Sequence, residues 1–210
     1  YGVSNMLEVF RDARFPVLLG NVVDETTRKS LFPADTILTV AGVRIGVIGT
    51  VTDELFDVTS REATRGVLLL PSTRMVEVSL ERLMPITDIQ IALTHQGVQA
   101  DSMLAVALGA ELDLIIGGHS HTILFEPLYV NGVPILQAGS KGEYLGIVEM
   151  LVNPVENRIE KMISHLEPVI AGTWPEDPEV AKLVEKQEAA VSAEFREEVA
   201  VLQTPWVLNY

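Results

Sequence analysis

The sequence predicts an α/β fold that contains at least one parallel crossover. Residues 88–95 (DIQIALTH) and 112–121 (LDLIIGGHSH) have the pattern of buried strands that end in glycine-containing loops, and an apolar helical pattern over residues 100–110 lies between them. Strand, helix and strand within about 30 residues is the spacing of a right-handed crossover between parallel strands. The carboxyl ends of both strands should therefore lie side by side, at the edge where open α/β sheets bind ligands.

Four patterns precede this crossover. Residues 3–14 carry a helical apolar stripe, and residues 15–23 (FPVLLGNVV) form a mostly apolar run of strand character. Residues 36–51 (TILTVAGVRIGVIGTV) contain two β-branched runs around Ala-Gly, which predicts a hairpin. Residues 72–84 have the spacing of an amphipathic helix. Strands and helices thus alternate through the first half of the chain.

The pattern changes after the crossover. Apolar runs at 133–139, 144–153 and 157–169 are separated by Asn-Gly, Lys-Gly and Asn-Pro signals, which favours an antiparallel meander. A Gly/Pro-rich stretch follows, and then a long Ala-, Glu- and Lys-rich helix whose start is marked by Asp177 and Pro178. Asp at the cap followed by Pro at the first helical position is typical of a helix N-terminus.

Composition excludes several classes of protein. The chain of 210 residues is 48% hydrophobic, but its apolar runs are far shorter than the roughly 20 residues that cross a bilayer, so no transmembrane segment is expected. With 15 Lys and Arg against 29 Asp and Glu, a basic track for a nucleic acid polymer is not expected. The absence of cysteine excludes disulfides, thiolate metal sites and cysteine nucleophiles.

Three of the four histidines occur where the two crossover strands end. In an extended segment, His119 and His121 would point the same way with Cα atoms about 6–7 Å apart. Because two metals in a hydrolytic pair lie about 3.5–4 Å apart, one imidazole could bind each ion, with His95 reaching in from the adjacent strand. Gly117 and Gly118 would let the backbone approach the ions, and imidazole ligands suit Zn, Mn, Fe, Co or Ni.

Other polar residues near these strands have simpler interpretations. His165 lies in a charged, alternating segment and should face solvent, and Asp101 should cap a helix away from the site. Asn21 ends another predicted strand and could contact substrate, or it could be a buried amide that holds a turn. A single histidine after a strand is more often structural than a ligand. Three imidazoles also do not complete a dinuclear site, so the site is either mononuclear or incomplete.

Four motifs together resemble one known family. In order and spacing, FPVLLGNV, ALTHQG, DLIIGGHSHT and VPILQAGSKGEYLG are similar to the catalytic domain of calcineurin-like metallophosphoesterases. The similarity is to the 5′-nucleotidase branch, which includes UDP-sugar hydrolases and 2′,3′-cyclic-nucleotide phosphodiesterases. It implies a two-sheet sandwich flanked by helices, with the N-terminal strands missing from this chain. It further implies two divalent metal ions, one bound by His95 and His119 and the other by His121.

The resemblance also implies an activity and a domain organisation. The expected reaction is hydrolysis of phosphate esters of nucleotides, with a small-molecule nucleotide as substrate. Residues 1–172 would be part of the catalytic domain, with the catalytic histidine and the remaining metal ligands upstream of Tyr1. Residues 173–210 would be a linker and a long helix leading to a C-terminal domain. Such enzymes are periplasmic, extracellular or attached to the cell surface.

The alternative is a non-catalytic fragment. The chain would then act as a scaffold or interaction module that binds one structural metal or none. In either case an incomplete sheet exposes unpaired backbone groups along its edge. We therefore expect a dimer or a swapped oligomer through that edge.

Overall fold

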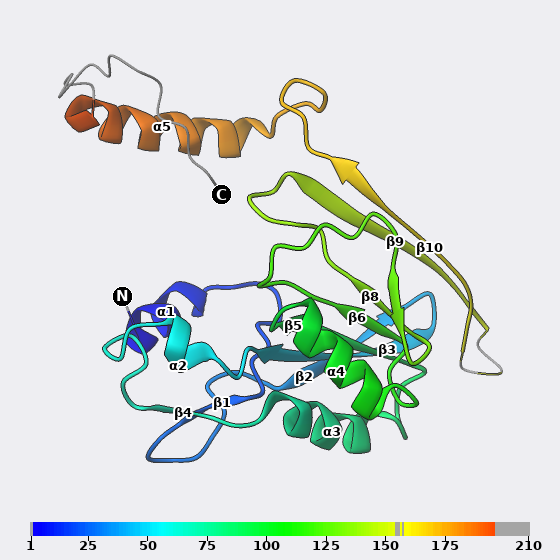
Figure 1. Ribbon diagram of the computed structural model, residues 1–210. Helices are drawn as coiled ribbons and strands as arrows, with labels where there is room; N and C mark the ends of the chain where they lie inside the picture. The colour runs from blue at the N-terminus through cyan, green and yellow to red at the C-terminus, as the bar shows by residue number, and fades with distance from the viewer. Residues whose placement is uncertain (1, 154–155, 157, 196–210) are drawn as a thin grey trace, which may run out of the picture. The chain divides into compact units, whose positions relative to one another are not determined.

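The structure is a computed structural model that describes residues 2–153, 156 and 158–195 (Figure 1). The chain divides into two compact units, Tyr1–Val169 and Ile170–Tyr210, compared with the boundary after residue 172 expected from the resemblance. The first unit carries the sheets and the histidines. In the second unit the described structure is dominated by one helix.

A six-stranded mixed sheet organises the first unit, in the order β2-β3-β5-β6-β8-β7. Its four central strands are mutually parallel, and the two outer strands, β2 and β7, are antiparallel to their neighbours. The strands are β2 (Asp35–Val40), β3 (Val43–Val51), β5 (Ile89–His95), β6 (Leu114–Ile116), β7 (Leu128–Val130) and β8 (Val133–Leu136). The parallel crossover is confirmed. The expected association through a sheet edge stays a prediction.

Two tight turns set the outer hairpins. Ala41 and Gly42 join β2 to β3 with φ of 50° and 87°, and Asn131 and Gly132 join β7 to β8 with φ of 50° and 83°. Positive φ at both central residues is the requirement of a type I′ turn, whose twist matches that of the flanking strands. The Ala-Gly hairpin and the Asn-Gly turn signal are confirmed.

Two helices cover one face of this sheet. The amphipathic helix α3 (Ser72–Leu83) and the crossover helix α4 (Val98–Leu108) bury a shared apolar core against the central strands. The fully buried members of this core include Val76, Leu80, Leu83, Leu104, Ala105, Ile48, Ala92, Ile115 and Ile135. Hydrophobic burial of this extent is the main stabilising contribution to a domain of this size.

A long antiparallel hairpin of β9 (Tyr144–Asn153) and β10 (Arg158–Pro168) covers the other face. Ile89, Ile91 and Leu114 form a second core beneath it. The hairpin contributes Val148, Met150, Val152, Ile159 and Met162 to this core. The expected α/β architecture, a sheet packed on a second sheet and flanked by helices, is confirmed.

The strand expected at 15–23 is much shorter than the pattern indicated. Only β1 (Val22–Asp24) is a strand, and it pairs with β4 (Val67–Leu69) outside the main sheet. The preceding segment lies against the end of β3: the Gly20 N–H donates to the carbonyl of Gly49 (2.8 Å), and a Cβ atom on Gly49 would overlap the Leu18 side chain. The first helix, α1 (Val3–Phe10), also ends before residue 14, and a short helix α2 (Leu55–Val58) follows β3.

The predicted antiparallel meander is wrong for β8, although β9 and β10 do pair antiparallel. β8 pairs in parallel with β6 rather than with β9, which lies in a separate sheet. Gly139, Lys141 and Gly142 all have positive φ, so the chain turns away from the six-stranded sheet at this point. The Asn-Pro signal falls partly outside the described residues.

The second unit contains α5 (Pro178–Phe195). Asp177 caps it as expected, because its Oδ1 accepts hydrogen bonds from the backbone N–H of Glu179 (2.9 Å) and Val180 (3.1 Å). Within the described part of the chain, no helix combines the length and the apolar character needed to cross a membrane.

Candidate metal site

His95 and His119 meet at the carboxyl edge of the parallel sheet. His95 is the last residue of β5, and its ring centroid lies 5.2 Å from that of His119, with the rings inclined at 69°. Side chains alternate along a strand, so His95 is on the face of Ile89 and Ile91, whereas Thr94 is on the face covered by α4. The crossover thus brings together the two histidines that the spacing predicted.

His119 and His121 lie in a left-handed loop rather than in an extended strand. β6 ends at Ile116, and His119 and His121 have φ of 77° and 56°. The expected geometry, in which both side chains project from one face of a strand, is therefore wrong. Left-handed φ in a residue other than Gly costs about 1–3 kcal/mol and persists only where the surroundings enforce it. Here such a conformation occurs at both histidines of the motif.

Two hydrogen bonds join the histidine loop, residues 117–122, to the start of α4. The backbone N–H of Gly97 donates to the carbonyl of Gly118 (3.0 Å), and the N–H of Val98 donates to Ser120 Oγ (3.1 Å). Gly97 has φ of 90°, a conformation that a side chain would strain. The turn after β5 and the turn after β6 therefore hold each other in register, which fixes His95 relative to the histidine loop.

The two glycines of the motif make room for other side chains. A Cβ atom on Gly117 would overlap the carboxylate of Asp101, and one on Gly118 would lie 2.9 Å from Nδ1 of His95. We expected these glycines to let the backbone approach metal ions. The structure shows a different requirement, which is close packing of the histidine loop against His95 and Asp101.

The prediction that Asp101 caps a helix away from the site is wrong. It lies inside the first turn of α4, is 0% exposed, and accepts a hydrogen bond from Thr94 Oγ1 (2.6 Å) through Oδ1. Its Oδ2 has no hydrogen-bond partner among the described residues and faces Gly117. Burial raises the pKa of this carboxyl, although the Thr94 hydrogen bond and the nearby Gln96 side chain oppose the shift. Asp101 is thus a buried acid beneath the histidine loop, not a helix cap. The apolar helix pattern around it gave no signal of this contact.

Asn21 lies near His95 but has a structural role in this geometry. It is 0% exposed, its Nδ2 donates to the carbonyl of Val51 (2.8 Å), and its Oδ1 accepts from the Val51 N–H (3.0 Å). Val51 is the partner of His95 in the β3–β5 ladder. The buried-amide interpretation agrees with these contacts, and substrate binding by Asn21 stays a prediction.

The donor chemistry of the histidines suits a transition-type divalent ion. Burial lowers the pKa of His95, and the nearby His119 and His121 lower it further, so the neutral imidazole that metals require is favoured. Within the part of the chain that the structure describes, no group of three or more His, Cys, Asp or Glu side chains is placed to hold one ion. The histidine side chains are therefore of a type that binds such a metal ion, but they supply only part of a coordination shell.

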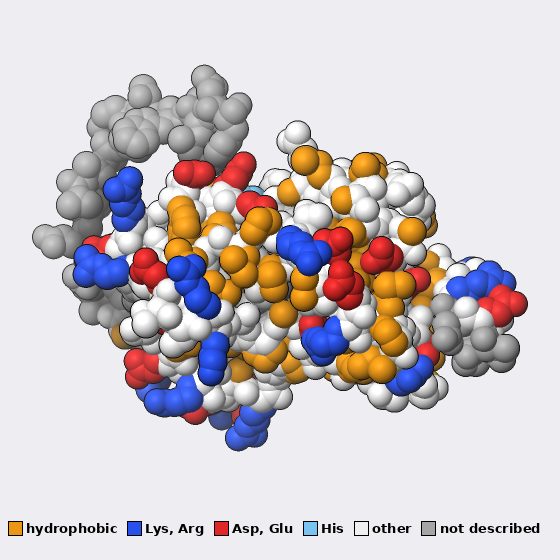
Figure 2. Space-filling model, turned by 90° about the horizontal axis from the view of Figure 1, so that it is seen from below, with side chains coloured by type: hydrophobic (Ala, Val, Ile, Leu, Met, Phe, Trp, Pro, Cys, Tyr) orange, Lys and Arg blue, Asp and Glu red, His pale blue; other side chains and the backbone are white. Residues whose placement is uncertain are grey.

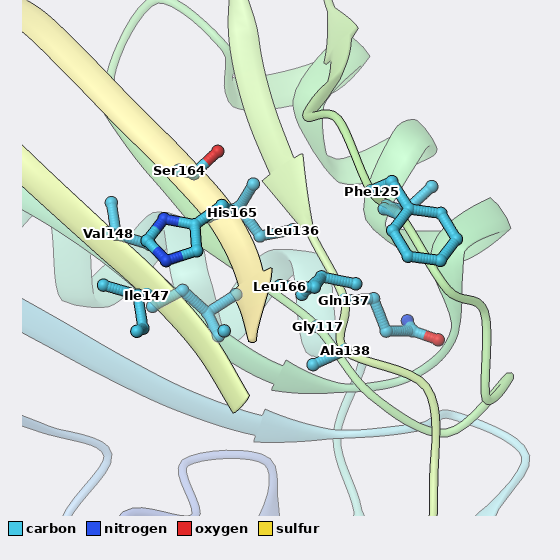
Figure 3. A pocket seen from close by; sticks show the side chains of 13 residues that line it. Gly117, Phe125, Leu136, Gln137, Ala138, Ile147, Val148, Ser164, His165 and Leu166 are labelled. Carbon is cyan, nitrogen blue, oxygen red and sulfur yellow. The ribbon is translucent and has the colours of Figure 1, made fainter. Parts of the chain in front are cut away.

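A mostly apolar cavity of about 180 Å³ lies beside the histidine loop. Figure 3 shows Phe125 and Gln137 on one side of it, and Val148 and His165 of the β9–β10 hairpin on the other. His165 is exposed, as its alternating segment predicted. Because charged phosphate groups are not stabilised by an apolar wall, the edge that carries His95 and His119 is the better candidate for phosphate chemistry.

Comparison with known sequences places these features in a class of proteins. No family model matches the chain. It is 25% identical over 189 residues to an uncharacterised metallophosphoesterase of Bacillus subtilis, YunD, covering 89% of this chain and 40% of YunD. A Tabanus yao apyrase is 28% identical (90% and 36% covered), and a Vibrio cholerae 5′-nucleotidase is 30% identical (64% and 30% covered). The chain thus spans 30–40% of the length of these relatives.

Solved structures agree on the fold. A 5′-nucleotidase precursor from Thermus thermophilus matches with a TM-score of 0.82 at 23% identity, covering 95% of this chain and 42% of its own. The Thermus thermophilus sulfate thiohydrolase SoxB matches with a TM-score of 0.85 at 23% identity, covering 91% and 35%.

The resemblance inferred from the motifs is confirmed: the relatives of this chain include a metallophosphoesterase, and its fold matches that of a calcineurin-like phosphoesterase of Bacillus subtilis, YfkN, with a TM-score of 0.76 at 21% identity, covering 94% of this chain and 69% of YfkN. Within that class, its relatives include 5′-nucleotidases and apyrases, which are hydrolases.

Proposed function

We propose that the whole protein hydrolyses phosphate esters of nucleotides and that this chain supplies part of its dinuclear metal site. The observation that carries the proposal is the contact between His95 and His119, whose ring centroids are 5.2 Å apart at the carboxyl edge of the sheet. Nucleotide substrates are supported by the relatives named as 5′-nucleotidase and apyrase.

Each histidine has a proposed role. His95 and His119 bind one divalent ion of the Zn, Mn, Fe, Co or Ni class, and His121 binds the second. Bound divalent ions would supply Lewis-acid polarisation of the phosphoryl oxygens and an activated water. The chain itself contributes neutral imidazoles, holds them at fixed positions on the histidine loop, and buries Asp101 behind them.

The charge of the chain is compatible with this role for metal ions. The formal net charge is −14, and on the face shown in Figure 2 the Lys and Arg side chains are mixed with Asp and Glu. A phosphate substrate therefore requires other cations for its neutralisation, and two divalent ions provide them. The same distribution disfavours a nucleic acid polymer as a partner.

The proposal extends to parts of the protein beyond these residues. We place the remaining metal ligands and the catalytic histidine upstream of Tyr1 and the substrate-binding domain after the α5 helix, as in the family that the motifs resemble. The same resemblance supports a location outside the cytoplasm or at the cell surface. The domain division at residue 172 belongs to this proposal.

A measurement of metal content and phosphatase activity tests it. We expect hydrolysis of AMP by a version of the chain extended upstream, and we expect His119→Ala in that version to lower activity by more than about 100-fold, since even changes outside the coordination shell cost 10–100-fold. His165→Ala, a matched exposed histidine, should retain both metal and activity. Full activity and metal content in the His119→Ala variant would contradict the assignment.

A second function, that of a scaffold, is also compatible with the structure. The described residues supply no group of three metal-binding side chains at one point, which is compatible with a scaffold that holds one structural metal or none. The extended version separates the two functions, because a scaffold would hydrolyse neither AMP nor a generic phosphodiester when loaded with metal.

A further inference from the structure

Gln137 contacts the histidine loop at three points and is 3% exposed. It follows β8 directly, on the strand adjacent to the one that leads into the loop. Neither the histidine motif nor the metal assignment uses this residue. We propose that Gln137 is a positioning residue that holds His119 and His121 in their metal-binding conformation. The inference rests on the proposed function for its chemical purpose, and on the hydrogen bonds of Gln137 for its structural part.

The three hydrogen bonds of Gln137 reach the residues on either side of the two histidines. Its Oε1 accepts from the backbone N–H of Thr122 (2.6 Å) and from Ser120 Oγ (2.9 Å), and its Nε2 donates to the carbonyl of Gly118 (3.0 Å). Gly118 precedes His119, Ser120 separates the histidines, and Thr122 follows His121. The Gln137 side chain therefore hydrogen-bonds to the residue before His119, to the residue between the two histidines and to the residue after His121.

The pattern of donors and acceptors requires a primary amide. Ser120 Oγ accepts from the N–H of Val98 (3.1 Å) and is 2.9 Å from Thr122 Oγ1. The Ser120 hydroxyl can therefore donate its proton to Gln137 Oε1 while it accepts hydrogen bonds from the Val98 N–H and the Thr122 hydroxyl. The other end of the Gln137 amide must donate to a carbonyl. A thioether has no donor and is only a weak acceptor, and an ionised carboxylate has no donor.

Backbone strain explains why the loop needs such support. Both histidines have left-handed φ, which costs about 1–3 kcal/mol at each residue other than Gly. Three hydrogen bonds to one side chain that is itself 3% exposed can together offset a cost of this size. Without Gln137 the histidine loop is expected to sample ordinary backbone conformations, in which the imidazoles no longer converge.

The test compares two variants at Gln137 with a matched glutamine elsewhere. Gln137→Met keeps the length of the side chain and removes all three hydrogen bonds, whereas Gln137→Glu keeps the acceptors and loses the donor to Gly118. Gln90→Met is the control, because Gln90 is a partly buried glutamine at the opposite end of β5 whose amide donates to Thr87 Oγ1 (3.0 Å). Thermal unfolding establishes that each variant is folded.

Two readouts on the 210-residue chain decide the inference. The first is the backbone NMR order parameter of residues 119–122 without metal, which should fall from about 0.85 toward 0.6 in Gln137→Met and less in Gln137→Glu. The second is the affinity for Co²⁺, followed by its absorption spectrum, which should fall about 10–100-fold in Gln137→Met. Gln90→Met should change neither quantity.

The outcomes separate this inference from the proposed function. Unchanged order parameters in folded Gln137→Met and Gln137→Glu would overturn the positioning role, even if the wild-type chain binds Co²⁺. Equal Co²⁺ affinity in wild type and Gln137→Met would also overturn it. If the wild-type chain and its extended version bind no Co²⁺, the proposed function fails, and the order parameters alone then decide whether Gln137 holds the loop.

Discussion

The two ends of the parallel strands use polar groups in different ways: those at the amino end are partly exposed, and those at the carboxyl end are buried. At the amino end, Asp88 accepts hydrogen bonds from the backbone N–H (2.7 Å) and guanidinium (2.6 and 3.1 Å) of Arg44, and Asp113 accepts from the Gln90 N–H (2.8 Å). These carboxylates hold neighbouring strands in register by accepting hydrogen bonds from their backbone N–H groups. Their hydrogen bonds have no evident purpose beyond stability.

At the carboxyl end, polar groups are buried without full satisfaction. Among the described residues, Asp101 Oδ2, Thr50 Oγ1 and Gln96 Oε1 lack hydrogen-bond partners, and His119 and His121 have left-handed backbones. Buried polar groups are normally satisfied, and strained residues cluster at functional sites. The comparison indicates that the carboxylates at the amino end are paired, whereas buried polar atoms at the carboxyl end, where the histidines lie, are left without partners among the described residues.

The largest change in stability is expected from filling the space beneath the histidine loop, at the carboxyl end of the strands. Gly117→Ala should lower the free energy of unfolding by about 2–3 kcal/mol, because its Cβ would overlap the buried Asp101 carboxylate. Gly146→Ala is the control, since the nearest atoms to its new Cβ would lie at 3.8 Å. Urea denaturation measures both. A double-mutant cycle with Asp101→Ala should recover part of the loss, and strict additivity would show that the two residues do not interact.

The pH dependence of stability should have opposite signs at Asp101 and Asp88. Burial raises the folded-state pKa of Asp101 above 3.8, so the contribution of Asp101 to stability is fully present below that pH and is lost as the pH rises through the folded pKa. Arg44 lowers the folded-state pKa of Asp88 below 3.8, so the stability from Asp88 is present above pH 3.8 and is lost as the pH falls through the folded pKa.

Single variants separate these two contributions. Relative to wild type, Asp101→Asn should become more stable as the pH rises from 4 to 8, since it removes a charge that is costly to bury. Asp88→Asn should become relatively less stable as the pH rises from 2 to 4. Urea denaturation at several pH values measures both trends. If Asp101→Asn follows the pH profile of wild type throughout, the buried acid does not titrate as its environment indicates.

The smallest expected effect concerns the strain in the histidine loop itself. Asn adopts left-handed φ readily, because its short polar side chain can hydrogen-bond to the local backbone, so His121→Asn should raise the free energy of unfolding by up to about 1 kcal/mol in the absence of metal. His165→Asn is the control, because His165 lies in a regular strand. Thermal unfolding resolves the difference. A loss of stability in His121→Asn would show that the imidazole makes contacts that outweigh its backbone strain.

Much of the architecture followed from local patterns in the sequence. The crossover, the Ala-Gly hairpin, the helix at 72–84 and the Asp177 cap depend on periodicity and turn chemistry within short segments. The meeting of His95 with the histidine loop also followed, because parallel strands joined by a crossover must end at the same edge. The short strand at 22–24 did not follow, because an apolar run does not reveal whether it joins the main sheet or a separate one.

The sequence by itself determined the fold class, the motif resemblance and the three candidate ligands. Only the tertiary structure decided that His119 and His121 are left-handed, that Asp101 lies beneath them, and that Gln137 holds the loop between them. The physical reason is that these features depend on contacts between residues 15 or more positions apart, such as Thr122 with Gln137. Local periodicity carries no information about such contacts, whereas packing and hydrogen-bond satisfaction in the folded chain decide them.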